Sequence, residues 1–142
     1  MTLTSDEKAD ALGRIALFEG LERSSLLPLA EAASEIDFDD GDVLVIQGQI
    51  GTGLFIVVNG AVRIVRHGED VAQLSPGDYL GELAVIDREP RSASAFAVGP
   101  TTCLALASWD LFRRVDADPA LSHALLRGLA LRVRSLSDHH HH

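Results

Sequence analysis

The chain has 142 residues, 46% hydrophobic and 23% charged, which fits a single globular domain better than two. Its 12 Lys and Arg face 21 Asp and Glu, so the formal net charge is −9. This charge disfavours direct binding to nucleic acid or to an anionic membrane, because both need cationic surface. No run of about 18 apolar residues and no secretory signal occurs, so we expect a cytoplasmic location without membrane contact.

The acidic charge is concentrated at the front, where residues 1–42 carry 11 acids and three bases. We favour a solvated N-terminal surface that keeps the protein soluble, and a docking face for a basic partner is the alternative. The single cysteine, Cys103, lies in the apolar run CLALA and predicts a buried thiol in a reducing compartment. His139–His142 are typical of an expression tag, and the two remaining histidines are too few and too far apart for a metal site.

The N-terminal part has helical periodicity. From Ser5 to about Ser34, leucine, isoleucine and alanine recur at the spacing of one helix face. Gly20 interrupts this pattern. The sequence therefore predicts two or three short helices over residues 5–34.

A β region follows, over residues 36–107. Short Val- and Ile-rich segments alternate with glycine-bearing turns about every ten residues, which favours an antiparallel roll over a parallel sheet. Asn59-Gly60 predicts a hairpin turn between FIVV and AVRIV. His67–Asp70 and Ser75–Asp78 predict further turns, and SASAFAV and TCLALA are expected as two later strands.

Helices return over residues 108–136. Ser108 is the expected N-cap of a helix beginning WDLFRRV, and Asp118-Pro119 is expected to open the last helix. One apolar stripe runs along that last helix, formed by Leu121, Leu125, Leu129 and Val133.

Together these elements predict one domain over residues 1–138. Its fold class is mainly β with flanking α: an antiparallel β jelly roll (a double-stranded β-helix) between N-terminal and C-terminal helices.

Residues 81–93, GELAVIDREPRSA, have a pattern suited to anion binding. Gly81 lets the backbone approach a ligand closely, and the short apolar run after it has the length of one helical turn with unpartnered amide groups. Arg91 offers a planar guanidinium to a phosphate, with the Ser92 hydroxyl as a further donor. Glu82 beside an anion suggests a neighbouring sugar hydroxyl, as in a ribose cyclic monophosphate. The alternative is an ordinary connection in which Glu82 and Arg91 pair with each other.

The pattern G-E-L-A followed by P-R-S-A, after a Pro-Gly-Asp turn, resembles the phosphate-binding cassette of cyclic nucleotide-binding domains. The resemblance covers roughly residues 15–136. It implies that Glu82 holds the ribose 2′-hydroxyl and Arg91 the cyclic phosphate, assisted by backbone amides. Those amides belong to Gly81, Leu83 and Ala84.

The same resemblance bears on ligand choice. Ser92 favours cAMP and leaves cGMP open, and Ala93 is small enough for the base to approach. In the family the C-terminal helix often caps the base. The candidates here are Leu125, Leu129, Arg132 and Val133, and a role of the leucines in the core or a dimer seam stays equally open.

The expected function is that of a ligand sensor. It needs no cofactor and no metal, and the chain lacks the residue sets of an enzyme. Binding of cAMP would reposition the C-terminal helices and regulate an unknown effector protein or domain, with a homodimer through those helices as a further expectation. The alternative is a protein-interaction domain of the same fold that no longer binds nucleotide.

Overall fold

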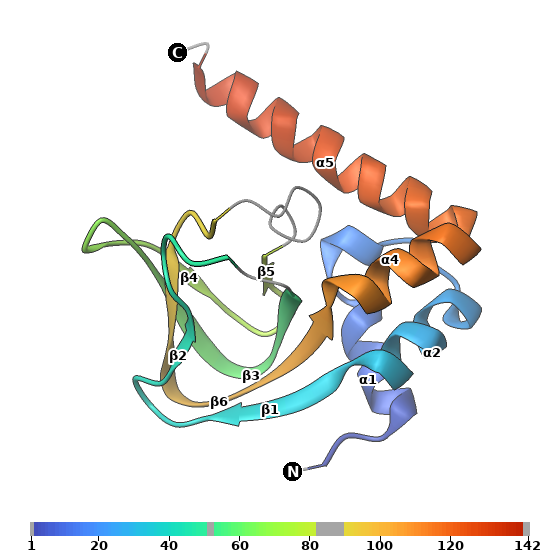
Figure 1. The fold of residues 1–142 in the computed structure, drawn as a ribbon, viewed down its shortest axis with the longest axis horizontal. Helices are drawn as coiled ribbons and strands as arrows, with labels where there is room; N and C mark the ends of the chain where they lie inside the picture. Colours follow the sequence, from blue (N-terminus) through green and yellow to red (C-terminus); the bar gives the residue numbers. More distant parts are fainter. Residues whose placement is uncertain (1, 51–52, 82–89, 141–142) are drawn as a thin grey trace.

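A strongly curved sheet with helices gathered at one end makes up the chain (Figure 1). The computed structural model describes residues 2–50, 53–81 and 90–140. In chain order the elements are α1 (Ser5–Gly13), η1 (Ala16–Phe18), α2 (Arg23–Ala32), β1 (Ser34–Phe38), β2 (Val43–Val45), β3 (Gly53–Arg66), β4 (Glu69–Leu74), β5 (Tyr79–Leu80), β6 (Ser94–Ala107), α4 (Ser108–Ala117) and α5 (Pro119–His140). This order confirms the predicted fold class, a β roll between two groups of helices.

The N-terminal helices are fixed by polar contacts at their ends. Thr4 and Glu7 form a capping box at the start of α1, with reciprocal bonds of 3.1 and 3.0 Å that satisfy otherwise unpartnered amides. Arg23 of α2 pairs with Asp6 and Asp10 of α1 over 2.8 and 2.9 Å. Because these side chains are exposed, each ion pair contributes at most about 1 kcal/mol.

The helical region ends earlier than the predicted range 5–34. Helix α2 ends at Ala32, and Ser34 already pairs with Ala105 of β6. Ala33 has the extended conformation, with φ −78° and ψ 136°. The alanines at this junction suit either structure, so periodicity alone placed the boundary two residues too late.

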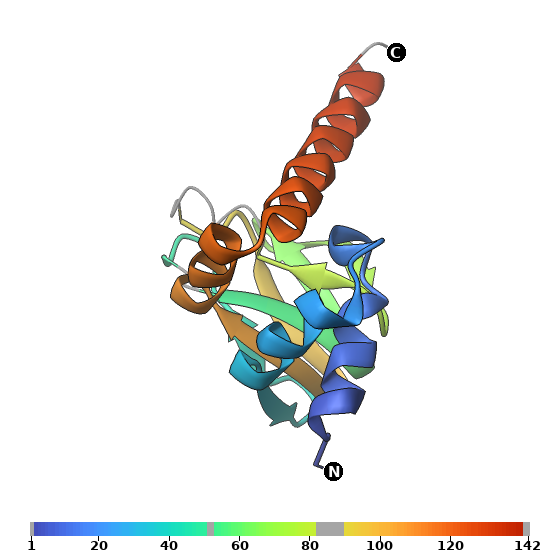
Figure 2. The same cartoon turned by 90° about the vertical axis from the view of Figure 1, so that its right-hand side faces the viewer.

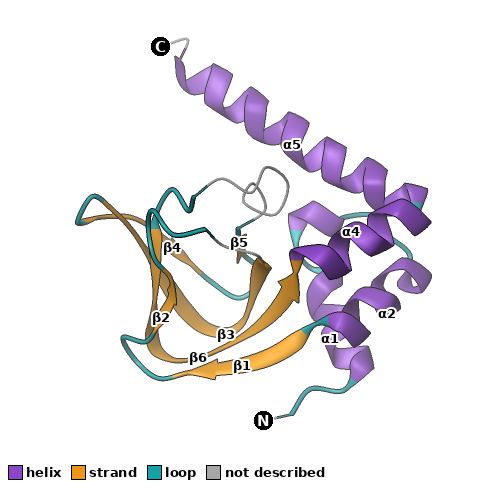
Figure 3. Ribbon diagram, viewed as in Figure 1, coloured by secondary structure: helices purple, strands orange, loops and turns teal. Residues whose placement is uncertain are grey.

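All strand pairs of the sheet are antiparallel, as predicted. The strand order is β1-β6-β3-β4, with β2 also paired to β6 and β5 to β3. The two longest strands, β3 and β6, have 14 residues each and run side by side through the curved sheet (Figure 3). These two strands hold the remaining elements of the roll together.

The predicted hairpin at Asn59-Gly60 is wrong, because β3 continues through both residues. Both halves of β3 pair with β6, and the register shifts around Asn59. Gly60 has φ +86°, and a Cβ there would lie 2.5 Å from the Pro100 carbonyl oxygen. The left-handed glycine therefore permits a bulge and a close strand contact instead of a chain reversal. TCLALA and SASAFAV, the latter from Ser94 onward, likewise form the single strand β6 instead of two strands.

Two other predicted turns are confirmed. His67 and Gly68 connect β3 to β4 with φ of 52° and 80°, the left-handed conformation that a two-residue hairpin turn favours. In the Ser75–Asp78 turn, Asp78 N donates to Ser75 O over 2.9 Å and Ser75 N donates to Asp78 Oδ2 over 2.8 Å. Each turn is closed by its own residues, which is why local sequence identified it.

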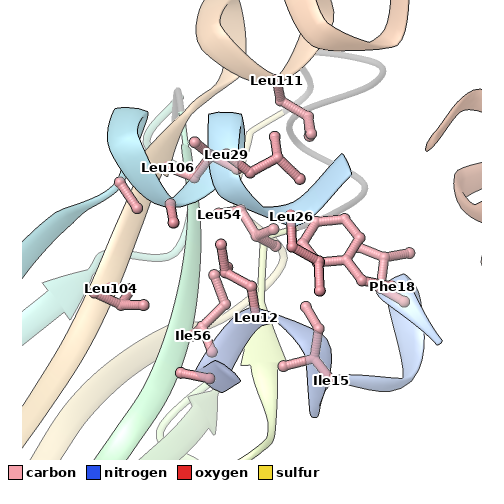
Figure 4. Close-up of a cluster of buried hydrophobic side chains, with 14 of the residues drawn as sticks. Leu12, Ile15, Phe18, Leu26, Leu29, Leu54, Ile56, Leu104, Leu106 and Leu111 are labelled. Atoms are coloured by element: carbon pink, nitrogen blue, oxygen red, sulfur yellow. The ribbon is translucent and has the colours of Figure 1, made fainter. Parts of the chain in front are cut away.

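Side chains on opposite faces of β3 and β6 serve two cores. Leu54 and Leu106 pack on the face covered by the helices, whereas Val57 and Cys103 pack inside the roll. This alternation follows from the two-residue period of a strand. Figure 4 shows the helix-side core with Leu12, Ile15, Phe18, Leu26, Leu29, Leu54, Ile56, Leu104, Leu106 and Leu111.

The prediction that Ser108 caps helix α4 is wrong. The N-cap position is Ala107, which has no capping side chain, and Ser108 is the first helical residue. Strand β6 runs directly into α4, so the strand's last residue takes the cap position. The predicted Asp118-Pro119 start of α5 is confirmed, because Asp118 Oδ1 accepts from Ala120 N over 3.1 Å.

Helix α5 packs on η1 near its start and then extends away from the body (Figure 2). Arg127 donates to the carbonyl oxygen of Glu19, and a Cβ on Gly128 would lie 2.7 Å from Leu17 Cδ1. The helix continues to His140, four residues past its predicted end at 136. None of the described helices combines the length and the apolar content needed to cross a membrane.

Candidate functional site

Arg91 is the one buried charged residue among those whose burial the structure describes, with 7% of its surface exposed. Its Nη2 donates to the carbonyl oxygen of Gly53 at the start of β3 over 2.7 Å. Burying a guanidinium is costly unless polar groups surround it. A buried, always protonated arginine at this place is suited to receive an anion.

Gly81 touches the Arg91 guanidinium directly. It has φ +98°, and a Cβ there would overlap Arg91 Nη1 and come within 2.6 Å of the Gly53 carbonyl oxygen. A residue with a side chain would therefore be strained and would displace the guanidinium. Gly81, Gly53 and Arg91 thus form one close-packed group from three separate segments of the chain.

A cavity of about 500 Å³ lies against this group. Its wall includes Arg91 and Gly53, Phe55 of β3, Ile50, and Trp109 of α4. The volume falls within the usual range for small-molecule sites. The lining combines one buried cation with mostly apolar side chains, which suits an amphiphilic anion.

The main chain of Arg91 is held by the segment after β2. Gly48 N donates to Arg91 O over 2.9 Å, and Arg91 N donates to Gln49 O over 2.8 Å. Next to them Ile50 forms an isolated antiparallel bridge with Pro90. Nothing in the sequence indicated this pairing, because the two segments lie about forty residues apart in the chain and carry no turn or strand pattern that would join them.

The structure brings together some of the predicted ligand residues. Gly81 and Arg91 are in contact, Ser92 beside them is exposed, and Ala93 is half-buried. The predicted residues Glu82, Leu83 and Ala84 lie outside the described residues.

The candidate base-capping residues have different positions on α5. Leu125 is buried in the helix-side core, whereas Leu129 is half-buried. Arg132 and Val133 belong to the helix, but their side chains lie outside what the structure describes. In this arrangement Leu125 therefore serves the core.

Sequence reasoning missed most of the residues that line the cavity, Gly53 and Trp109 among them. Gly53 contributes a carbonyl oxygen to Arg91, and Trp109 contributes a ring that is 63% exposed at the start of α4. The presence of a single tryptophan next to the predicted helix start was the available signal for Trp109. No local signal pointed to Gly53, since its role is carried by the backbone.

The other titratable candidates are structural. Cys103 is fully buried inside the roll, and this burial raises the pKa of its thiol to about 11. Among the described residues, no group of three or more His, Cys, Asp or Glu could hold a metal ion.

Comparison with known proteins agrees with the fold. Residues 35–118 match the cyclic nucleotide-binding domain family. A CRP-like cAMP-activated global transcriptional regulator of Mycobacterium tuberculosis is 32% identical over 131 residues, covering 88% of this chain and 58% of the relative.

Two solved structures are similar over most of the chain. The N-terminal domain of a transcriptional regulator from Streptomyces coelicolor A3(2) has 33% identity and a TM-score of 0.81, covering 91% of this chain and 94% of that one. The catabolite activator protein of Thermus thermophilus has 34% identity and a TM-score of 0.78, covering 86% of this chain and 60% of that one.

The chain belongs to the cyclic nucleotide-binding domain family, as the resemblance in its sequence implied. Its span is 58% of the length of the mycobacterial relative. That relative is a regulator by name, and the shared part is the domain described above.

Proposed function

We propose that this domain is a cyclic nucleotide sensor without catalytic activity, with cAMP as its ligand and cGMP as the alternative. The observation that carries the proposal is the buried guanidinium of Arg91, held against Gly81 beside a cavity of about 500 Å³. A ring phosphate supplies the single negative charge that such a guanidinium can neutralise bidentately. The mycobacterial relative is named as cAMP-activated, which supports the choice of cAMP.

In the proposed complex, different residues of the predicted cassette bind different parts of the ligand. Arg91 and the Ser92 hydroxyl bind the cyclic phosphate, assisted by amides of Gly81, Leu83 and Ala84. Glu82 accepts a hydrogen bond from the ribose 2′-hydroxyl. Ala93 leaves room for the base.

The proposed output is a movement of α5. The first half of this helix is anchored on the body by Leu121 and Leu125 in the helix-side core and by the bond from Arg127 to the Glu19 carbonyl oxygen. The later part extends away from the body (Figure 2), and the proposed movement is that of this later part. A base cap from Leu129, Arg132 or Val133 would favour one position of the helix. A ligand shifts this equilibrium only by its differential affinity, so a tenfold preference supplies about 1.4 kcal/mol.

The signal passes, in this proposal, to an effector domain or a separate partner in the cytoplasm. The relatives' names point to transcription, but the net charge of −9 argues that this domain does not itself bind nucleic acid. A second copy of the chain, paired through α5, is the other proposed partner. We expect no membrane contact.

Calorimetric titration with cAMP, cGMP and 2′-deoxy-cAMP tests the ligand. The deoxy ligand should bind more weakly by about 1–3 kcal/mol, because it leaves the Glu82 carboxylate unpaired. Arg91→Ala should cost about 2–5 kcal/mol of binding free energy, while Arg63→Ala, which removes an exposed arginine of β3, should cost little. If wild type binds none of the three nucleotides, the proposal fails.

One observation favours the second candidate, a protein-interaction domain. Ile46, Ile50 and Trp109 are 45%, 68% and 63% exposed, and all three line the same cavity. Clustered exposed apolar residues are typical of docking surfaces. If the domain only docks a protein, Trp109→Ala should weaken that complex, and Arg91→Ala should change it little.

A further inference from the structure

The side chain of Arg66 and the backbone of Gln47, both outside the cassette, hold the segment that carries Arg91. Arg66, at the end of β3, donates from Nε to the carbonyl oxygen of Ser92 over 3.2 Å. Gln47, just after β2, donates from its backbone N to Ser94 Oγ over 2.8 Å. Ser92 and Ser94, which follow Arg91 closely in the chain, are therefore held by two different segments, the end of β3 and the segment after β2.

Gln47 also ties its own segment to the β3–β4 turn. Its Oε1 accepts from the backbone N of His67 over 3.0 Å, and its Nε2 lies 3.2 Å from His67 Nδ1. His67 follows Arg66 directly in the chain. The end of β3 and the turn after it are therefore tied to two segments: Arg66 bonds to Ser92 at the end of the cassette, and His67 bonds to Gln47 after β2.

That segment in turn pairs with the main chain of Arg91. Gly48 N and Gln49 O bond to Arg91 O and N over 2.9 and 2.8 Å. The Arg91 backbone thus lies between two anchored points, Gln47 before this pairing and Ser92 after it.

We propose that Arg66 and Gln47 are positioning residues that hold the backbone of Arg91 in place for ligand binding. They would act without touching the ligand. The reason is pre-organisation: a guanidinium on a freely moving segment must be ordered when the phosphate binds, which weakens affinity. The ligand itself is that of the proposed function, on which this part of the inference rests.

An alternative role for Arg66 is long-range attraction of the phosphate. Salt screens attraction between exposed charges, but it affects a hydrogen bond to a neutral carbonyl far less. Arg63 is a matched control, because it lies three residues earlier on β3, is similarly exposed, and pairs with Asp70 over 3.1 Å instead of with the cassette. Arg63→Ala removes the same charge and leaves the described network intact.

The first test is hydrogen exchange, which needs no ligand. In Arg66→Ala and Gln47→Ala, the amides of Gly48 and Arg91 should exchange about 3- to 10-fold faster than in wild type, as expected for loss of one or two partly exposed hydrogen bonds. Arg63→Ala should leave both rates unchanged. Unchanged rates in Arg66→Ala and Gln47→Ala would overturn the proposal.

The second test is calorimetric titration with cAMP at low and high salt. Arg66→Ala and Gln47→Ala should each weaken binding about 3- to 10-fold at both salt concentrations, with Arg63→Ala close to wild type. A loss that disappears at high salt, or that Arg63→Ala reproduces, would overturn positioning in favour of charge attraction. Wild-type protein that binds neither cAMP nor cGMP would refute the proposed function, and the exchange rates would still decide whether these residues hold Arg91.

Discussion

Gly81 and Arg91 are packed so closely that a Cβ at position 81 would overlap the guanidinium nitrogen Nη1. They lie ten positions apart in the chain, and the contact lies beside the carbonyl oxygen of Gly53. The position of the buried cation therefore depends on the absence of a side chain opposite it.

We predict that Gly81→Ala destabilises the protein and weakens cAMP binding more than Gly77→Ala does. Both glycines have left-handed φ, +98° and +95°, so both variants incur strain of roughly 1–2 kcal/mol. A Cβ on Gly77 meets nothing within 4 Å, whereas one on Gly81 must displace Arg91. Thermal unfolding and calorimetry of the two variants provide the measurement, and equal losses in both would show that the close contact is unimportant.

Turns closed by their own residues could be predicted from sequence, whereas contacts between distant strands could not. His67-Gly68 turns the chain as expected through its own left-handed φ angles, and Ser75–Asp78 does so through a side-chain bond within the turn. Asn59-Gly60 carries the same kind of signal, yet pairing with β6 on both sides keeps β3 continuous. Long-range hydrogen bonding overrides a local preference of this size.

The candidate site, like the fold, could be predicted only in part from the sequence. The pattern around Gly81 and Arg91 pointed to an anion, and the structure puts these two residues in contact. The cavity wall from Gly53 and Ile50 could not be predicted, since it comes from segments that meet only in the folded chain. Sequence identified the charged centre but not its surroundings.

We predict that Cys103 resists alkylation in the native protein at neutral pH. It has no exposed surface, and burial raises the pKa of the thiol to about 11, so the reactive thiolate is scarce. Labelling with iodoacetamide should therefore require unfolding and should accelerate as urea is added. Rapid labelling without urea, at the rate of a free cysteine, would contradict the described packing.

We predict that the chain forms a dimer through Leu126, and that Leu126→Glu dissociates it. Leu126 is 64% exposed on α5, with Leu129 and Ala130 next to it on the same helix face. Burying such a leucine fully contributes about 1.5–3 kcal/mol. Sedimentation velocity over a range of concentrations measures the effect.

Leu131→Glu is the matched control for this prediction. Leu131 is 56% exposed but lies about 140° further around the helix, where Arg127 and Arg134 are its neighbours one turn away. It should leave the dimer intact. Wild-type protein that sediments as a monomer at every concentration, or a dimer that tolerates Leu126→Glu, would refute this pairing.

We predict that Asp118 makes the start of α5 sensitive to acid. A hydrogen bond from the Ser25 side chain, and others from the backbone amides of Leu121 and Ala120, lower the pKa of Asp118 below its usual 3.8. A carboxyl group whose pKa is lowered by folding stabilises the protein above its unfolded pKa, and this contribution is lost as pH falls through the folded pKa. Stability should therefore decline below about pH 4.

Asp118→Asn separates the charge of this residue from its capping role. Asparagine caps a helix about as well as aspartate, so stability near pH 7 should change little, while the decline in acid becomes shallower. Asp118→Ala should lose about 1 kcal/mol at neutral pH, because the bond to Ala120 N disappears. Denaturant unfolding between pH 2 and pH 7 measures all three proteins, with Asp116→Asn as the control for removing an exposed aspartate two residues earlier. Identical acid dependence in wild type and Asp118→Asn would show that the lowered pKa has no part in anchoring α5.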